Sequence, residues 1–498
     1  MRCDVLLAGL APVPADLAAV EIAGVAHDSR AVHPGDLFFA LAGARTDGRR
    51  HVAEARARGA RAVVAPGPLD AGGLPVVVVE EPRRVLGLVA ARLAGDPSAA
   101  LTLVGVTGTN GKTTTTYLLE AIWRATGRTT GVIGTISYRV GAESRPAPYT
   151  TPEAPELQRL LAEMRAAGAT HVAMEVSSHA LAQERVRGCR FDAAVFTNLT
   201  RDHLDFHGDM ESYFAAKARL FLDHLPAGGK PDPVAIVNVD DPAGARLARA
   251  VRTRCVPVGR APEALVRAVD VETSLAGTRG TLLLAGERLP FASPLVGAPH
   301  VENIAVAAAA AWALGASPDA IAAGIAAAAP PPGRVERIAG PGFTVVIDYA
   351  HTPDALARLL DALRPLAAGA LIAVFGCGGD RDRGKRPLMG EAAARRADLV
   401  VLTSDNPRTE DPDRILADIE AGVRAAGLVR LAAPRAGGRG YVVEADRRAA
   451  IALAVDLARP GDLVVVAGKG HEDYQIVGTE KRHLDDREEV RRALEGRA

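Results

Sequence analysis

One short stretch constrains this chain more than any other: residues 101–114 read LTLVGVTGTNGKTT. An apolar run ends in a glycine turn, and the residues after the turn have the pattern of a helix that stops at Gly127. Strand, glycine turn and helix N-terminus together point backbone N–H groups at phosphate oxygens. Lys112 adds a charge for the outer phosphates, and Thr113 or Thr114 offers a hydroxyl to Mg²⁺. The stretch therefore predicts a phosphate-binding loop in an α/β domain.

The stretch departs from the usual G-x-x-x-x-G-K-[ST] pattern, because Val106 stands where that pattern has its first glycine. Val106 belongs to the predicted strand, and Gly105 and Gly108 on either side of it keep the turn flexible. The alternative interpretation is a plain strand–helix connection with an incidental lysine. The polar clusters that follow other strands favour the phosphate site.

The rest of the chain alternates short apolar runs with alanine-rich helical stretches, which is typical of β-α units around mostly parallel sheets. A length of 498 residues suits roughly three domains. Breaks at 95–98 (GDPS) and 330–333 (PPPG) predict domains at 1–98, 99–332 and 333–498. Within the middle range, residues 269–294 alternate apolar and polar side chains around glycine turns, which predicts an antiparallel ribbon beside the main sheet.

Composition excludes several classes of protein. The 59 basic residues balance 59 acidic ones, so nothing indicates nucleic acid as a general partner. The 4 cysteines are scattered without a C-x-x-C pair, so they indicate neither a zinc site nor a disulfide framework. This pattern is typical of a protein in a reducing compartment. The N-terminus lacks a convincing signal peptide, and the alanine-rich runs are too short to span a membrane. We expect a cytoplasmic protein without membrane insertion.

Polar side chains follow two further strands of the middle range. Glu175 ends an apolar run in HVAMEVSSH, and Asp202 and His203 follow another in FDAAVFTNLTRDHLDFHG. Ligands gather outside the carboxyl ends of strands in α/β sheets, and a carboxylate with an imidazole beside a phosphate loop suits Mg²⁺. Each residue taken singly is more often a cap or an ion-pair partner. Lys217, in a predicted helix, would from its charge alone be a solvated lysine.

Polar side chains also follow the strands of the last range. Asp348 and His351 come after one strand, and the sequences around Asp405, Arg408 and Glu472 come after two others. Guanidinium groups in glycine-rich loops pair bidentately with carboxylates. Acidic and basic groups together suit a zwitterion such as an amino acid better than a nucleotide.

The segments TGTNGKTT, MEVSSHAL, FTNLTRDHLDFHG, YFAAKARLF, DYAHTPDAL and SDNPRTEDP occur in this order, and together they resemble the Mur ligase family of peptidoglycan synthesis. The resemblance covers essentially the whole chain. It implies a small α/β uridine-nucleotide domain, a central P-loop ATPase-like domain with a parallel sheet, and a Rossmann-like C-terminal domain. It also accounts for Val106, since the family's phosphate loop is written TGTNGKTT.

The resemblance implies an ATP-dependent, Mg²⁺-assisted ligase with residues in named roles. The implied ATP contacts are Gly108, Thr109, Asn110, Gly111, Lys112, Thr113, Thr114, Asn303 and Arg334. The implied catalytic residues are Lys112, Glu175, His203, Lys217, Asp348 and His351. The implied metal ligands are Thr113, Glu175, His203 and Lys217, the last as a carbamate formed with CO₂. This role reverses the interpretation of Lys217 as a solvated side chain. His300 departs from the family, whose members often carry asparagine there.

Two further sets of contacts follow from the resemblance. The implied contacts to UDP-N-acetylmuramoyl-L-alanyl-D-glutamate are Ser29, Arg45, Thr46, Thr150, Thr151, Ser177, Gln183 and Arg185. The implied contacts to meso-2,6-diaminopimelate are Arg381, Asp405, Asn406, Pro407, Arg408, Gly468 and Glu472. Arg408 can clamp the far carboxylate that lysine lacks. The alternatives are L-lysine as the added amino acid, a folylpolyglutamate synthase, a P-loop switch ATPase, and a non-catalytic nucleotide-binding scaffold. We expect a monomer.

Overall fold

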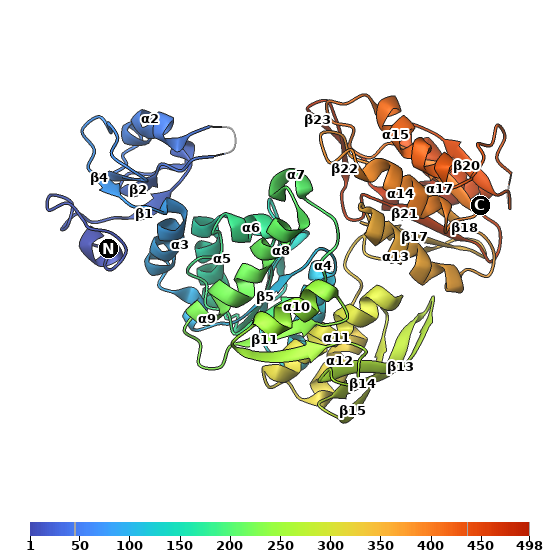
Figure 1. The fold of residues 1–498 in the computed structure, drawn as a ribbon, viewed down its shortest axis with the longest axis horizontal. Coiled ribbons are helices and arrows are strands. Elements are labelled where there is room, and N and C mark those ends of the chain that lie inside the picture. Colours follow the sequence, from blue (N-terminus) through green and yellow to red (C-terminus); the bar gives the residue numbers. More distant parts are fainter. Residues whose placement is uncertain (44–45, 436, 498) are drawn as a thin grey trace.

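The computed structural model describes residues 1–43, 46–435 and 437–497, and three α/β units follow one another along the chain (Figure 1). Their sheets span residues 24–78, 102–293 and 336–467. The α/β class with parallel sheets is therefore confirmed. Each sheet lies inside one of the three predicted ranges, and 1–98, 99–332 and 333–498 stay our proposed division into domains.

The first unit is a parallel sheet of four strands in the order β1-β2-β3-β4. Its two central strands are buried on both faces, as expected for strands between helical layers. The strands are β1 (Gly24–Ala26), β2 (Asp36–Phe39), β3 (Ala62–Ala65) and β4 (Val76–Val78), and the helices are α1 (Cys3–Leu6), α2 (Val52–Ala57) and α3 (Pro82–Leu93).

The second unit holds an eleven-stranded sheet in the order β15-β14-β13-β12-β11-β10-β5-β9-β6-β7-β8. Its strands are β5 (Thr102–Thr107), β6 (Thr130–Ile133), β7 (Ser137–Val140), β8 (Glu143–Pro146), β9 (His171–Glu175), β10 (Ala193–Phe196), β11 (Val234–Asn238), β12 (Arg254–Val258), β13 (Val266–Ser274), β14 (Gly277–Leu284) and β15 (Glu287–Ser293). The predicted antiparallel ribbon is present as β13, β14 and β15. It begins at Val266 and continues the main sheet through β12 instead of standing beside it.

Helices cover both faces of this sheet. They are α4 (Lys112–Ala125), α5 (Ala154–Ala166), α6 (Ser178–Ala182), α7 (Leu204–His207), α8 (Met210–Arg219), α9 (Leu225–Ala227), α10 (Pro242–Ala250), α11 (Ala298–Ala313) and α12 (Pro318–Ala327). Side chains of β5 alternate between the two faces, so Val104 and Val106 join the core under α4, α11 and α12, and Leu103 joins the opposite core. Val106 is thus a core residue of the strand, as predicted. No helix within the described residues has both the length and the apolar character needed to cross a membrane.

The third unit holds a six-stranded sheet in the order β16-β17-β21-β18-β19-β20 and a separate two-stranded ribbon, β22-β23. Its strands are β16 (Glu336–Ala339), β17 (Thr344–Asp348), β18 (Leu371–Phe375), β19 (Leu399–Leu402), β20 (Gly440–Val443), β21 (Leu463–Ala467), β22 (Tyr474–Val477) and β23 (Glu480–His483). Its helices are α13 (Pro353–Leu363), α14 (Lys385–Ala394), α15 (Pro412–Ala425), α16 (Arg447–Leu457) and α17 (Asp486–Glu495). Arg447 and Asp486 form a fully buried ion pair with an Nη2–Oδ2 distance of 2.6 Å.

The first and second units meet where α3 lies against the turn before β10. A Cβ built on Gly87 of α3 would lie 2.5 Å from the carbonyl oxygen of Arg187. The next residue of that turn, Gly188, has a φ of +87° and approaches Gly87 equally closely. Two glycines therefore allow backbone-to-backbone contact between the units, and a side chain on either would separate them.

We expect Gly87→Ala to lower the thermal unfolding midpoint by about 2–6 °C. Because the added methyl meets backbone atoms that cannot move aside cheaply, the steric cost lies toward the upper end of about 1–3 kcal/mol and exceeds the gain of about 1 kcal/mol that alanine brings inside a helix. Differential scanning calorimetry measures the effect. Gly67→Ala is the matched control, because a Cβ at Gly67 meets nothing within 4 Å. Equal midpoints for the two variants would contradict the close contact.

Candidate active site

The phosphate-binding loop connects β5 to α4 as predicted. Gly108 has a φ of +145° and Gly111 a φ of +90°, both in the region that favours glycine. A Cβ on Gly108 would collide with the Thr197 hydroxyl, and one on Gly111 would collide with the side-chain oxygen of Asn303. The loop therefore depends on glycine at these two positions, and the first glycine of the usual pattern is not required.

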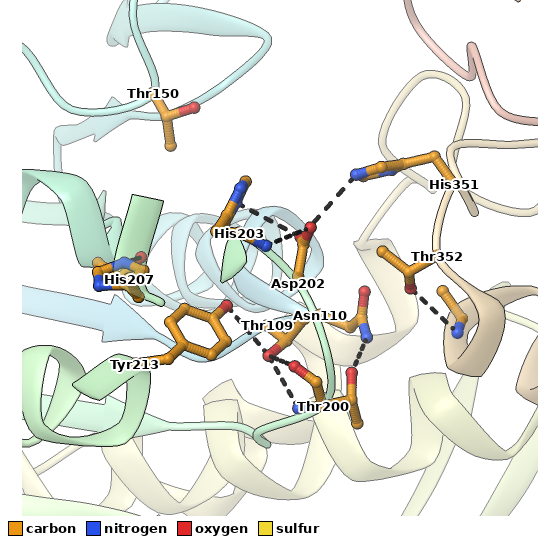
Figure 2. A network of polar contacts seen from close by, with 12 residues as sticks. Thr109, Asn110, Thr150, Thr200, Asp202, His203, His207, Tyr213, His351 and Thr352 are labelled. Carbon is orange, nitrogen blue, oxygen red and sulfur yellow. Dashed lines mark hydrogen bonds and ion pairs between the residues drawn. The ribbon is translucent and has the colours of Figure 1, made fainter. Parts of the chain in front are cut away.

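The loop is fixed by the segment that follows β10 (Figure 2). The Thr109 N–H donates to the carbonyl of Asn198 over 2.9 Å, and the Asn110 N–H donates to Asn198 Oδ1, also over 2.9 Å. The Thr109 hydroxyl donates to the Thr200 carbonyl over 3.1 Å and lies 3.2 Å from the hydroxyl of Tyr213. The sequence pattern singled out Asn198 as one of the polar residues after this strand, but not Thr200, which also follows β10, or Tyr213, which lies in α8.

Two lysines converge on one carbonyl of this loop. Lys112 Nζ donates to the Gly108 oxygen over 3.0 Å, and Lys217 Nζ of α8 donates to the same oxygen over 2.8 Å. Lys217 is only 1% exposed, so the interpretation of a solvated lysine is wrong. Burial, followed by the charge of Lys112, lowers the pKa of Lys217 far below its ordinary value. Burial therefore favours the neutral, nucleophilic amine of Lys217 over its ammonium form.

Glu175 stands at the end of β9 and faces the loop. Its Oε1 accepts from the Thr113 hydroxyl and from the Thr135 N–H, each over 2.9 Å, and its Oε2 accepts from the Thr135 hydroxyl over 3.0 Å. Thr135 follows β6, and sequence analysis did not single it out. Within the part of the chain that the structure describes, no group of three or more His, Cys, Asp or Glu residues is arranged to hold a metal ion. The Thr113 hydroxyl and the Glu175 carboxylate are a pair of neighbouring oxygen groups at the loop that could ligate a metal ion.

Asp202 links the second and third units (Figure 2). Its Oδ2 lies 3.4 Å from Nε2 of His203 and 4.0 Å from Nε2 of His351, which belongs to the third unit. Burial disfavours the Asp202 carboxylate, yet His351, His203 and Lys385 together lower its pKa below the ordinary value. Burial lowers the pKa of His203 to about 4, so its imidazole is neutral at pH 7.

A cavity of about 250 Å³ lies between the second and third units. Its walls are the phosphate loop with Glu175 and His203 on one side and Arg334, Asp348 and His351 on the other. Arg334 Nη2 lies 3.5 Å from the Thr113 hydroxyl, and the Arg334 guanidinium lies 4.6 Å above the ring of Tyr349. The cavity is also lined by Asn303, Thr150 and Ser177. The predicted ATP and catalytic residues therefore line one cavity, apart from Gly108 and Lys217, which lie outside its lining.

Two ion pairs hold the walls of the cavity together. Arg358 of α13 lies 2.5 Å from Glu302 of α11, and Arg201 lies 3.2 Å from Asp382. All four side chains are at least partly exposed, and exposed pairs contribute little energy each. These two ion pairs by themselves therefore add little resistance to opening of the cavity.

The residues predicted for the amino acid form a second cluster in the third unit. The Asn406 amide donates to Glu472 Oε2 over 3.0 Å, and Arg408 Nη1 donates to the Gly379 carbonyl over 2.7 Å. A Cβ on Gly468 would lie 2.7 Å from Asp405 Oδ2. The cluster contains the predicted residues Asp405, Asn406, Pro407, Arg408, Gly468 and Glu472. Arg381 lies near Arg408 across Gly378, but its own hydrogen bond is to the neighbouring Asp380 carbonyl.

The two sites share one edge. The Tyr349 hydroxyl lies 3.5 Å from Glu472 Oε1, and Tyr349 also lines the phosphate-loop cavity. The Gly468 N–H donates to the Asp348 carbonyl over 3.0 Å. The amino-acid cluster therefore opens beside the nucleotide cavity.

The residues predicted for the muramoyl dipeptide lie in two places. Thr151, Gln183 and Arg185 contact one another beside the cavity, and the Thr151 hydroxyl also donates to the Glu175 carbonyl over 2.8 Å. In the first unit, the Ser29 hydroxyl donates to Glu54 over 2.7 Å, and the Thr46 hydroxyl lies 3.0 Å from Nε2 of His51. Arg45 lies outside the described residues. Among the residues that the structure describes, Ser29 and Thr46 do not line the cavity.

The fold and site define an ATP-using ligase, and the chain belongs to the Mur ligase family. The family's catalytic domain matches residues 21–92, its middle domain matches residues 106–311, and its glutamate ligase domain matches residues 333–470. Members of this family use ATP.

Named relatives are similar over nearly the whole chain. UDP-N-acetylmuramoyl-L-alanyl-D-glutamate--2,6-diaminopimelate ligase of Geobacter metallireducens is 51% identical, over 96% of this chain and 94% of its own. The enzyme of the same name from Gloeobacter violaceus is 49% identical, over 100% and 99%. A solved structure of an enzyme of that name is 35% identical with a TM-score of 0.72, over 100% and 99%. MurF ligase of Thermotoga maritima in complex with ADP shares the fold, at 20% identity and a TM-score of 0.64, over 96% and 99%.

We expect Gly108→Ala to weaken ADP binding by about tenfold or more, because a methyl group at this φ collides with Thr197 and displaces the loop. Isothermal titration calorimetry with ADP measures the change. The Gly67→Ala variant should bind ADP as the unaltered chain does. Unchanged affinity in Gly108→Ala would show that the nucleotide does not bind at this loop.

Proposed function

We propose that this chain is an ATP-dependent amide ligase that adds meso-2,6-diaminopimelate to UDP-N-acetylmuramoyl-L-alanyl-D-glutamate, a step of peptidoglycan precursor synthesis. The relatives that are about 50% identical carry this activity in their names. The single observation that carries the proposal is the shared edge at Asp348 and Tyr349, where a phosphate-loop cavity meets a cluster of acidic and basic side chains. A nucleotide switch needs only the first of these sites.

The reaction must first activate a carboxylate, which is a poor electrophile. Transfer of the γ-phosphate of ATP to the D-glutamate carboxylate gives an acyl phosphate and ADP. A neutral amine of diaminopimelate then attacks the acyl carbon, the new C–N bond forms, and phosphate leaves as the amine loses a proton. Catalysis of this kind consists mainly of positioning and charge neutralisation.

The chain's own residues supply both effects. Lys112 can move from the Gly108 and Thr109 carbonyls to the outer phosphates, over a distance that its flexible side chain covers. Arg334 brings a second positive charge next to Thr113 from the third unit. Thr113 and Glu175 fit a magnesium ion because a hydroxyl and a carboxylate converge there, and such an ion would neutralise phosphate charge.

Lys217 and His203 are the proposed second pair of metal ligands. A neutral amine adds to CO₂ and releases a proton, which gives a carbamate. The buried Lys217 amine beside the phosphate loop suits this reaction, because burial favours the neutral amine and a carbamate would supply oxygen ligands there. His203, neutral near pH 7, retains a lone pair for the same purpose.

The two organic substrates enter from opposite sides of the cavity. Ser29, Arg45 and Thr46 are proposed to bind the uridine nucleotide, and Thr150, Thr151, Ser177, Gln183 and Arg185 are proposed to bind the peptide. The cluster around Asp405 and Arg408, with Arg381, Asn406, Pro407, Gly468 and Glu472, is proposed to bind diaminopimelate. Since one chain provides every set of contacts, we propose a monomer. ATP use and four free thiols suit the cytoplasm.

The decisive experiment measures ADP release with the muramoyl dipeptide acceptor and meso-diaminopimelate, L-lysine or no amino acid. We expect fast release only with diaminopimelate, because Arg408 can pair with its far carboxylate and lysine has none. Equal rates with lysine would favour the alternative amino acid. Rapid ADP release without any amino acid would favour a switch ATPase and contradict the proposal.

We expect Lys217→Ala to lose most of the ligase activity, by about 100-fold or more, and added bicarbonate should not restore it. The Lys481→Ala variant, which removes an exposed lysine of β23, is the control and should retain full activity. ¹³C NMR of the unaltered protein in ¹³C-bicarbonate should show a carbamate signal that Lys217→Ala lacks. Near-normal turnover in Lys217→Ala would contradict the carbamate role.

A further inference from the structure

A fully buried lysine lies beneath the amino-acid cluster, and neither the sequence nor the proposed function has given it a role. Lys469 follows β21 and has 0% exposure. Its Nζ donates to Glu472 Oε2 over 3.2 Å and to Asn406 Oδ1 over 3.3 Å. It also lies 3.9 Å from Asp405 Oδ1 and 5.4 Å from the centre of the Tyr474 ring. One ammonium thus contacts three residues of the cluster.

The contact to Asn406 fixes which way its amide points. Asn406 Oδ1 accepts from Lys469 and from the Ile476 N–H at 2.9 Å, both of which can only donate. The Asn406 Nδ2 group is therefore directed at Glu472. Lys469 thereby orients the amide and the carboxylate together.

The contact to the two carboxylates balances their charge. Burial raises the pKa of Glu472, and the charge of Asp405 raises it further, whereas Lys469 and the Asn406 amide lower it. Two carboxylates in one buried site share a proton unless a positive charge lies between them. Lys469 is the positive charge placed closest to both.

The other charged and titratable groups around Glu472 do not replace Lys469. Arg447 is committed to Asp486 at 2.6 Å, and the Arg408 guanidinium donates to the carbonyls of Gly379 and Asn406. Burial lowers the pKa of His471 to about 3, so this side chain is neutral. The hydroxyl of Tyr349 lies 3.5 Å from Glu472. Burial raises the pKa of both Tyr349 and Tyr474, so neither phenol carries charge near pH 7.

The backbone is shaped to bring Lys469 into this place. Gly468 has a φ of +115° and lies against Asp405 so closely that a Cβ would be 2.7 Å from Oδ2. Gly470 also has a positive φ, of +53°. A lysine between two such glycines turns inward beneath the cluster, where an ordinary strand-to-loop connection would leave it in solvent.

We propose that Lys469 is a positioning residue for the amino-acid substrate, whose ammonium keeps the Asp405–Glu472 pair ionised and oriented so that the pair binds an ammonium group of the amino acid. This inference rests on the proposed ligase function. According to this inference, Lys469 contributes to the specificity for a cationic amino acid although the substrate does not touch it.

The test is the Lys469→Met variant, assayed for ADP release at varied diaminopimelate and, separately, at varied ATP. We expect KM for diaminopimelate to rise about tenfold or more and KM for ATP to stay within about twofold. Without Lys469 the pKa of Glu472 rises further, so its ionised form returns only as the pH increases. KM for diaminopimelate in the variant should therefore fall as the pH rises, more steeply than in the unaltered protein.

Three further variants separate positioning from folding. Lys481→Met is the matched control, because exposed Lys481 lies 3.6 Å from the centre of the same Tyr474 ring, and it should leave KM unchanged. Lys469→Arg keeps the charge and should raise KM for diaminopimelate by only about threefold. Lys469→Met combined with Glu472→Gln should bind diaminopimelate no worse than Glu472→Gln alone, since Lys469 acts through the carboxylates.

Two results would overturn the inference alone. The first is a Lys469→Met variant with the KM and pH profile of the unaltered protein. The second is a Lys469→Met variant in which the KM values for ATP and diaminopimelate rise equally and the thermal midpoint falls. That result is expected if Lys469 has a purely structural role. If Lys469→Met does not fold, the Lys469→Arg and double variants decide the question by the same criteria. Absence of diaminopimelate-dependent ADP release in the unaltered protein would overturn the proposed function and this inference together.

Discussion

Parallel strands bring all their carboxyl ends to one edge of a sheet, and the active site of this chain depends on two such edges facing each other. In the second unit β5, β9 and β10 are neighbours, so the phosphate loop, Glu175 and the His203 segment start side by side. In the third unit β17 and β21 are neighbours, and β18 and β19 follow. Asp348 and Gly468 thereby lie next to each other. The cavity lies between these two edges, and the amino-acid cluster lies at the edge of the third unit.

Within this frame the site is built from buried ionisable side chains, each held by specific partners. Glu175 is 1% exposed and accepts three hydrogen bonds, Lys217 is 1% exposed and donates to a carbonyl, and Lys469 is 0% exposed and contacts two carboxylates. Removing such groups from water costs several kcal/mol each, so they are weak contributors to stability. Their value is preorganisation, because a group already oriented and desolvated does not have to rearrange when substrate binds.

Much of the fold followed from local patterns. The helix after the phosphate loop was predicted to stop at Gly127, and it ends at Ala125 with Thr126 as its C-cap. The predicted ribbon near 269–294 is real, but its place in the main sheet depends on the pairing of Val258 with Val266, which no local period reveals. Arg381, Asp405, Arg408 and Glu472 were grouped by their place after strands. The structure joins the last three through hydrogen bonds and close packing and leaves Arg381 bonded to its neighbour.

By itself, the sequence determined the phosphate loop, the α/β class and the expectation that polar residues after parallel strands lie close together. These features depend on hydrophobic periodicity, glycine positions and helix ends, which are all set within a few residues. It could not determine whether a lysine side chain is solvated or buried, because the neighbouring residues in the sequence do not distinguish the two cases. Only the tertiary structure placed Lys217 against Gly108, Lys469 against Asp405 and Glu472, and Asp202 between His203 and His351. Desolvation and charge pairing depend on groups far apart in the chain, and folding alone brings those groups together.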